Sequence, residues 1–268
     1  MKSKLYDGPV LVTGASRGIG RAVALMLADQ GFKVYCASRS GEAPMENENL
    51  VGIAMDVTDP ASVDAAAAKI DDLQVIVHCA GFGIAGSCEG VDTAGAKSQL
   101  NTNFFGVISV NHRFLPMLRR HSRSLVVITG SVAGLIPIPY QAHYSCSKYA
   151  LEAYTECLRM EGRDFGIRAS IVEPGDTHTS FTSKRQVLEG SDSPYYETCL
   201  KSVEKMASDE TNGKSPETAA RAIVRMLSRR EPPVRCAVGF EYKLFTMLKR
   251  LLPARFIEFL LRKMYIPK

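Results

Sequence analysis

The chain has 268 residues, of which 46% are hydrophobic and 23% are charged, so it has the composition of a globular protein and the length for one large core. Its formal net charge of +5 lies entirely in residues 240–268, which contain seven Lys or Arg and two Glu. Seven scattered cysteines form no Cys-x-x-Cys pair and no zinc spacing, which favours a reduced, cytoplasmic protein without a metal site. No apolar run reaches the roughly 18 residues of a membrane span, and the N-terminal run is too short for a signal peptide.

The first predicted element is a β-rich run from Pro9 to Thr13, which leads through a glycine-rich turn into a helical pattern that ends at Gly31. Such a turn is an anion site, because free backbone N–H groups and the positive end of the helix dipole point to the same place. One glycine permits the tight turn, one lets a pyrophosphate approach the backbone, and one lets the helix pack on the strand. The sequence therefore predicts a phosphate cradle, although a turn without a ligand is the alternative; its residues are Gly14, Ser16, Arg17, Gly18, Ile19 and Gly20.

The second predicted strand, from Phe32 to Ala37, ends at Ser38 and Arg39. NAD-selective sites place a carboxylate at this point, whereas an arginine accommodates the 2′-phosphate of NADP. Here there is no carboxylate, and Arg39 together with Arg17 of the turn offers two guanidinium groups for a phosphate. We expect NADP(H) as the cofactor; the alternative is that both arginines merely face solvent.

Strands and helices alternate along the rest of the chain, which predicts parallel strands joined by helical crossovers. In such sheets ligands lie beyond the carboxyl ends of the strands, where all the motifs fall. We expect a single-domain Rossmann fold over residues 1–268, a doubly wound parallel sheet of about seven strands flanked by helices, with a polar substrate lid at 176–212. Further strands are predicted at 50–55, 73–78, 125–129, 167–172 and 234–238, and helices at 60–70, 96–120, 144–165 and 216–229.

Tyr144 and Lys148 are four residues apart in the helix predicted at 144–165, so they share one helix face. A neighbouring positive charge favours the phenolate, which predicts a lowered pKa for Tyr144. Asn103 is a polar residue within the apolar part of the long helix at 96–120. It is either a satisfied core amide or a group that bends the helix or holds water.

Several motifs together resemble the classical short-chain dehydrogenases/reductases in the order of that family, over roughly residues 8 to 240. They are Thr13-Gly14-x-x-x-Gly18-x-Gly20, Asn103, Ser131, Tyr144-x-x-x-Lys148 and Pro174-Gly175. The run from Ser131 to Leu135, the apolar loop after it and the segment ending at Thr179 look most like the hydroxysteroid and retinol dehydrogenases.

The resemblance implies a catalytic role for four residues. Tyr144 would be the acid/base, and Lys148 would lower its pKa and hold the nicotinamide ribose. Ser131 would hydrogen-bond the substrate carbonyl oxygen, and Asn103 would keep a water that feeds protons past Lys148. The implied cofactor contacts, added to the cradle, Ser38 and Arg39, are Asp56, Val57, Ala80, Gly81, Tyr144, Lys148, Pro174, Gly175, Thr177 and Thr179.

One segment departs from the family pattern, because His78-Cys79-Ala80-Gly81 stands where the family has Asn-Asn-Ala-Gly. The missing asparagine removes a hydrogen-bonding group near the adenosine, and Cys79 is interpreted as a small buried packing residue. The implied function is NADP(H)-dependent interconversion of a ketone or aldehyde and an alcohol on an apolar substrate, such as a steroid, a retinoid or a fatty-chain ketone. The alternative is a non-catalytic NADPH-binding regulator or scaffold; a homodimer or homotetramer is a further family expectation.

The basic C-terminal extension, residues 240–268, has apolar residues at helical spacing on both sides of Pro253, which predicts two short amphipathic helices. Basic residues beside such a stripe suit peripheral contact with an anionic membrane surface. The alternative is that the stripe packs on the protein's own core or covers the substrate cleft. We expect no nucleic-acid partner, because no basic patch with a docking element is apparent.

Overall fold

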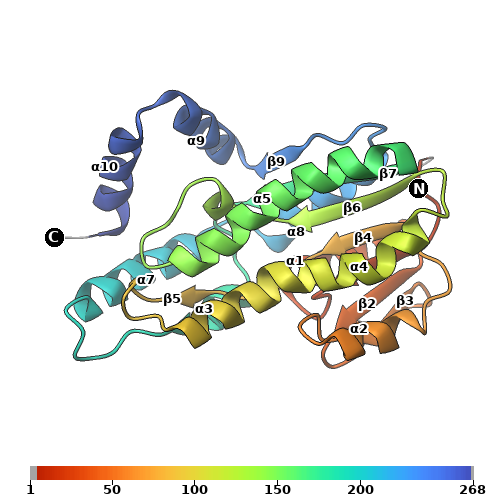
Figure 1. Cartoon of the computed structure of the whole chain (residues 1–268), viewed down its shortest axis with the longest axis horizontal. Helices are drawn as coiled ribbons and strands as arrows, with labels where there is room; N and C mark the ends of the chain where they lie inside the picture. The colour runs from red at the N-terminus through yellow and green to blue at the C-terminus, as the bar shows by residue number, and fades with distance from the viewer. Residues whose placement is uncertain (1–4, 267–268) are drawn as a thin grey trace.

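The computed structural model describes residues 5–266 and confirms the predicted fold class. Its central sheet has seven parallel strands in the order β3-β2-β1-β4-β6-β7-β9, so the chain winds outward from β1 in both directions (Figure 1). The strands are β1 (Val10–Thr13), β2 (Val34–Ser38), β3 (Leu50–Ala54), β4 (Val75–His78), β6 (Ser124–Thr129), β7 (Ile167–Pro174) and β9 (Arg235–Val238).

Helices cover both faces of the sheet, and each face has its own hydrophobic core. On one face α1 (Gly18–Asp29) and α8 (Pro216–Val224) pack against Val10 and Val12; on the other α2 (Pro60–Ala67), α4 (Gly106–Leu118) and α5 (Ala142–Gly162) pack around Leu11. Alternate side chains of one strand thus serve opposite cores, as the period of two requires. Both strand faces are buried, which explains the continuous apolar runs of the sequence.

The helix predicted at 96–120 is interrupted in the middle. It consists of α3 (Thr93–Leu100), a π-helical turn Asn101–Phe105, and α4. The turn contains Asn103 and widens the helix where the chain passes the carboxyl end of β4. Single π turns inside helices frequently mark functional sites.

The segment predicted as a polar lid, 176–212, is more ordered than its composition indicated. It contains α6 (Ser180–Ser183), the short strand β8 (Gln186–Val187) and α7 (Tyr196–Thr211). β8 pairs in parallel with β5 (Ile84–Ala85). The two strands form a second, small sheet that the sequence did not predict. This pairing fixes the lid to the loop after β4.

The C-terminal extension forms α9 (Phe240–Leu251) and α10 (Ala254–Tyr265), separated at Pro253 as predicted. Figure 1 shows both helices beyond β9, standing clear of the sheet on the side of α7. Ile257 and Leu261 are buried against Val132 and Ile136, so one face of the extension packs on the protein. Within residues 5–266, no helix is long and apolar enough to cross a membrane.

Candidate active site

A cleft of about 1390 Å³ opens at the carboxyl ends of the central strands. It is lined by the residues that the sequence indicated from the cradle, the strand ends, the π turn and α5, and their individual roles stay predictions. These are Gly14, Ser16, Arg17, Gly18, Ile19, Gly20, Ser38, Arg39, Asp56, Val57, Ala80, Gly81, Asn103, Ser131, Tyr144, Lys148, Pro174, Gly175, Thr177 and Thr179.

The glycine turn between β1 and α1 has a backbone that only glycine fits. Gly14 and Gly18 have φ of 66° and 54°, in the left-handed region. A Cβ on Gly20 would lie 2.4 Å from the carbonyl oxygen of Gly14, so the first helical turn could not seat on the strand end. Arg17 precedes the helix without a side-chain cap, which leaves the first backbone N–H groups of α1 for a ligand. The turn therefore fits a dinucleotide phosphate.

The predicted 2′-phosphate residues lie beside this turn. Ser38 is buried at the end of β2, with its hydroxyl 3.2 Å from the hydroxyl of Ser40. Arg17 and Arg39 are exposed at the cleft, and neither forms an ion pair within residues 5–266. Two unpaired guanidinium groups at one end of a cleft suit a phosphate ligand.

Asp56 lies at the same end of the cleft, after β3. The backbone N–H and the hydroxyl of Thr58 donate to Asp56 Oδ1 at 2.9 and 2.7 Å. These bonds lower the pKa of the Asp56 carboxyl, and the charge of Arg39 acts in the same direction. The carboxylate is thus held ionised and oriented at this end of the cleft.

The loop after β6 and the first turns of α5 bring the catalytic candidates together. Ser131 caps the short turn Val132–Gly134, and its hydroxyl accepts the N–H of Ala133 at 3.1 Å. The Lys148 ammonium lies 5.7 Å from the centre of the Tyr144 ring, as the four-residue spacing predicts, and donates to the carbonyl oxygen of Thr129 at 2.8 Å.

The electrostatics of Tyr144 differ from the prediction. Burial raises the pKa of Tyr144 to about 12, although a hydrogen bond with Ser131 acts in the opposite direction. Burial also lowers the pKa of Lys148 to about 8, and its ammonium faces the Thr129 carbonyl. The predicted lowering of the Tyr144 pKa by Lys148 is therefore wrong for this structure. At neutral pH the Tyr144 hydroxyl keeps its proton and is a proton donor.

Asn103 is a fully satisfied amide in the π turn. Its Oδ1 accepts the N–H of Phe82 at 3.1 Å, and its Nδ2 donates to the carbonyl oxygen of Phe82 and to Ser147 Oγ, each at 3.1 Å. It therefore ties the loop after β4 to α5, one residue before Lys148. The interpretation as a satisfied amide is confirmed, and the bending of the helix and the water-holding role stay predictions.

Cys79, which stands in place of the family asparagine, is partly buried behind the cradle. Its Sγ lies 3.2 Å from Thr129 Oγ1, and burial raises the pKa of the thiol to about 11. A thiol with so high a pKa is a poor nucleophile, in keeping with a packing role. The backbone N–H groups of Cys79 and Ala80 donate to Thr13 Oγ1 at 3.1 and 3.2 Å, which fixes this loop without an asparagine side chain.

The substrate side of the cleft has two aromatic residues, Phe181 and Tyr242, that the sequence did not single out. The Phe181 ring of the lid stands 5.6 Å from the Tyr144 ring, centre to centre. Tyr242 of α9 lies against Gly175, and its hydroxyl donates to Asp176 Oδ2 at 2.6 Å and accepts the N–H of Asp176 at 2.9 Å. Phe181 lies in the predicted lid, two residues after the motif that ends at Thr179, whereas Tyr242 is distant in sequence from every motif and was indicated only by the amphipathic pattern of the extension. Further apolar lining comes from Ile136, Ile138, Phe245 and Leu261.

Comparison with known proteins identifies the family. Residues 9–188 match the short chain dehydrogenase family, which is well over half of the chain. The chain belongs to the short-chain dehydrogenase family. It is therefore an oxidoreductase of a family that acts on CH–OH groups with a nicotinamide cofactor.

Similar short-chain dehydrogenases align with nearly the whole chain. A 3-ketodihydrosphingosine reductase of Bacteroides thetaiotaomicron is 37% identical over 264 residues, covering 96% of this chain and 97% of the relative. Human retinol dehydrogenase 8 is 31% identical over 265 residues, covering 90% and 84%. The crystal structure of a short-chain dehydrogenase from Streptomyces avermitilis superposes with a TM-score of 0.82 at 28% identity, covering 92% and 94%.

Proposed function

We propose that the protein is an NADP(H)-dependent oxidoreductase that interconverts a ketone or aldehyde and the corresponding alcohol on an apolar substrate. The observation that carries this proposal is one cleft in which Ser131, Tyr144 and Lys148 lie between a glycine cradle and an apolar wall. Two similar proteins are named as a 3-ketodihydrosphingosine reductase and a retinol dehydrogenase, which supports a lipid-like substrate.

Tyr144, Ser131 and Lys148 each have a separate role in carbonyl reduction. A bound nicotinamide supplies the hydride. Tyr144, protonated at neutral pH because burial raises its pKa to about 12, donates its proton to the carbonyl oxygen. Ser131 donates a hydrogen bond to the same oxygen and so stabilises its developing charge. Lys148, held by the Thr129 carbonyl, keeps a positive charge beside this pair below its pKa of about 8.

The cofactor would lie along the carboxyl ends of the strands. Gly14, Gly18 and Gly20 leave room for its phosphates, and the N–H groups at the start of α1 would bind them. Arg17 and Arg39 support the choice of NADP(H), because no carboxylate stands at the end of β2. Asp56 would contact the adenine, and residues 174–179 the nicotinamide amide.

Replacing Tyr144 by Phe tests the assignment. We expect the variant to lose turnover by about 10²-fold or more, because general acid catalysis contributes at least that much. NADPH binding, measured by fluorescence titration, should remain. Tyr195→Phe is the matched control, because Tyr195 is exposed on the lid and does not line the cleft.

Substrates for this test come from a screen of NADPH oxidation with steroids, retinal, fatty-chain ketones and small diketones. Full turnover in Tyr144→Phe would rule out its role as the acid. Tight NADPH binding without oxidation of any carbonyl would instead favour the non-catalytic regulator.

A further inference from the structure

The outward face of α9 carries a continuous apolar stripe that no other described element covers. Phe240, Leu244, Met247 and Leu251 follow one another at intervals of four, three and four residues, which places them on one side of the helix. All four are exposed, Phe240 by 79% and Leu251 by 73% of its surface. Water-facing apolar residues grouped in this way mark an interaction surface.

The second helix also exposes apolar side chains. On α10, Phe256 and Phe259 are exposed by 46% and 60%, three residues apart, and Lys263 follows at helical spacing on the same side. The buried residues Ile257 and Leu261 face the loop at 132–136 instead. The apolar residues of α10 therefore form two faces, and packing on the protein accounts for only one of them.

Five cations border the exposed stripe. Lys243 and Arg250 each precede an apolar residue of the α9 stripe, and Arg255, Arg262 and Lys263 are exposed on α10. None of them forms an ion pair within residues 5–266, whereas Glu241 is paired with Lys214. The rest of the chain has no net charge, so the whole excess of +5 belongs to this extension.

We propose that this face of α9 and α10 docks on an anionic lipid bilayer, with the apolar stripe in the interface and the five cations among the headgroups. An apolar helix face edged by Lys and Arg is the pattern of helices that lie in the membrane surface, and anionic lipids attract such cations. This face fits a second copy of the chain less well than an anionic bilayer, because a two-fold interface between two copies would bring their like charges together.

The inner side of the same helices forms part of the cleft, through Tyr242, Phe245 and Leu261. A docked bilayer would therefore adjoin the substrate side of the site. A carbonyl substrate that partitions into lipid would reach Tyr144 along these residues, a consequence that rests on the proposed function. Docking itself does not depend on catalysis, so the two are tested separately.

Vesicle co-sedimentation of the full-length protein tests the docking. We expect binding to vesicles of phosphatidylcholine with phosphatidylglycerol, weaker binding to phosphatidylcholine alone, and a loss of binding at high salt.

Four single substitutions each remove one of the cations and should each reduce partitioning into the anionic vesicles by about fivefold: Lys243→Gln, Arg250→Gln, Arg255→Gln and Arg262→Gln. A combined Phe240→Gln, Leu251→Gln and Phe259→Gln variant should lose binding to both vesicle types. None of these residues lines the cleft, so turnover of a small water-soluble carbonyl should be unchanged.

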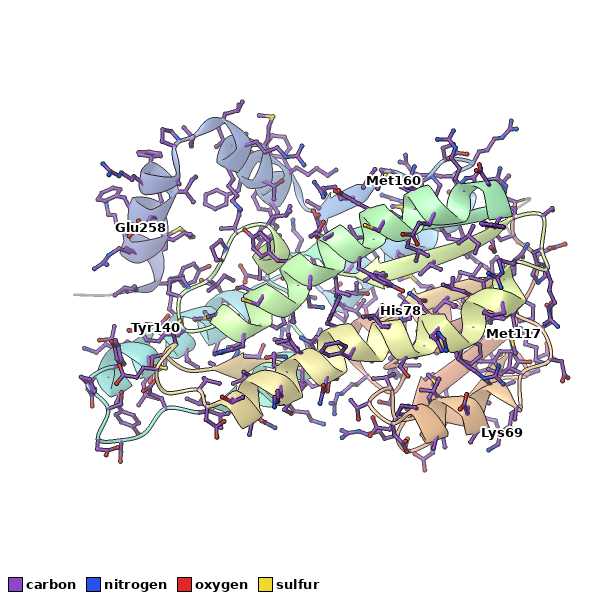
Figure 2. The ribbon with its side chains drawn as sticks, viewed as in Figure 1. Lys69, His78, Met117, Tyr140, Met160 and Glu258 are labelled. Carbon is purple, nitrogen blue, oxygen red and sulfur yellow. The ribbon has the colours of Figure 1, made fainter. Side chains whose placement is uncertain are left out.

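Two substitutions at the opposite edge of the sheet are the matched controls. Lys69→Gln removes an exposed cation from the end of α2, and Met45→Gln removes an exposed apolar residue between β2 and β3. Figure 2 shows Lys69 and Glu258 of α10 at opposite ends of the molecule. Both controls should bind vesicles as the wild type does.

Equal sedimentation of the wild type and the triple apolar variant would overturn the proposal, as would absence of wild-type binding to anionic vesicles. A wild type that self-associates in the absence of lipid, with a triple variant that does not, would assign the face to a second copy and overturn it too. A protein that binds vesicles but reduces no carbonyl would keep the docking and reject the proposed function.

Discussion

At Glu152, one helical turn beyond Lys148, a carboxyl group is buried against a second one. Glu152 and Glu173 are 6% and 1% exposed and share Arg235, whose Nε lies 3.3 Å from Glu152 Oε2 and 3.7 Å from Glu173 Oε1. Burial and the charge of Glu173 raise the pKa of Glu152 to about 8. The Arg235 guanidinium also pairs with Glu156, so it does not compensate both buried carboxyls, and the buried pair retains a proton at neutral pH.

This pair predicts a pH dependence of stability. The folded protein holds a proton that the unfolded chain releases near the ordinary value of 4.5, so this pair lowers the free energy of unfolding as pH rises towards 8. Burial lowers the pKa of His78 to about 4, which gives the opposite slope up to its ordinary value of 6.5, so the net fall should appear from about pH 6.5 to about pH 8. The slope is at most about 1.4 kcal/mol per pH unit for one proton. Urea unfolding across this range should show a flatter profile for Glu152→Gln than for the wild type or for Glu48→Gln, which is exposed. Parallel profiles for all three would contradict the buried proton.

Arg39 offers a second test at the residue scale. Arg39→Asp places a carboxylate where NAD-selective sites have one and removes a cation from the proposed 2′-phosphate site. The ratio of kcat/KM for NADPH over NADH should fall by at least about tenfold, corresponding to loss of a charge-assisted hydrogen bond of about 1.5 kcal/mol or more. Arg119→Asp, which is exposed at the end of α4, should leave the ratio unchanged. An unaltered ratio in Arg39→Asp would mean that Arg39 faces only solvent.

At the scale of elements, the lid is held by one buried ion pair. Arg185, whose side chain is 1% exposed, pairs with Glu210 of α7, and Thr182 Oγ1 donates to the same carboxylate at 2.5 Å. The pair links α6 and β8 to α7. It therefore keeps Phe181 beside Tyr144.

Removing this carboxylate should loosen the lid. Glu210→Gln leaves the buried Arg185 charge uncompensated, at a cost of about 3 kcal/mol. Hydrogen exchange should rise in residues 180–212, and KM for the carbonyl substrate should rise more than KM for NADPH. Asp64→Asn breaks an exposed pair with Arg113 between α2 and α4, and should cost less than about 1 kcal/mol. Unchanged exchange and KM in Glu210→Gln would mean that the β5–β8 pairing alone holds the lid.

At the scale of the whole molecule, the expected homodimer or homotetramer stays a prediction. Around α4 and α5 the structure exposes Phe105, Met160 and Phe165, and Figure 2 shows Met160 on the outer side of α5. A combined Met160→Glu and Phe165→Glu variant should shift the protein to a smaller oligomer, because charges would be buried in the interface. Light scattering measures the mass. The same mass for the wild type and this variant would place the interface elsewhere or leave the protein monomeric.

The sequence by itself determined the sheet, the cradle and the positions of Ser131, Tyr144 and Lys148. Apolar runs indicate which strands are buried on both faces, and glycines indicate a backbone with positive φ. A four-residue spacing indicates that two residues lie on one face of a helix. These properties are local, so residues near one another in the chain suffice to show them. The predicted helix at 60–70 ends at Ala67, which shows how weakly local preference marks an end.

Only the tertiary structure decided the properties that depend on distant parts of the chain. The pairing of β5 with β8 joins segments about a hundred residues apart, and Tyr242 reaches Asp176 across 66 residues. The pKa of Tyr144 followed burial and not its helical neighbour, because loss of solvent outweighed the hydrogen bond with Ser131 and the charge of Arg185. The two faces of α10 likewise became distinct only when one of them packed against the loop at 132–136 and the other was left in water.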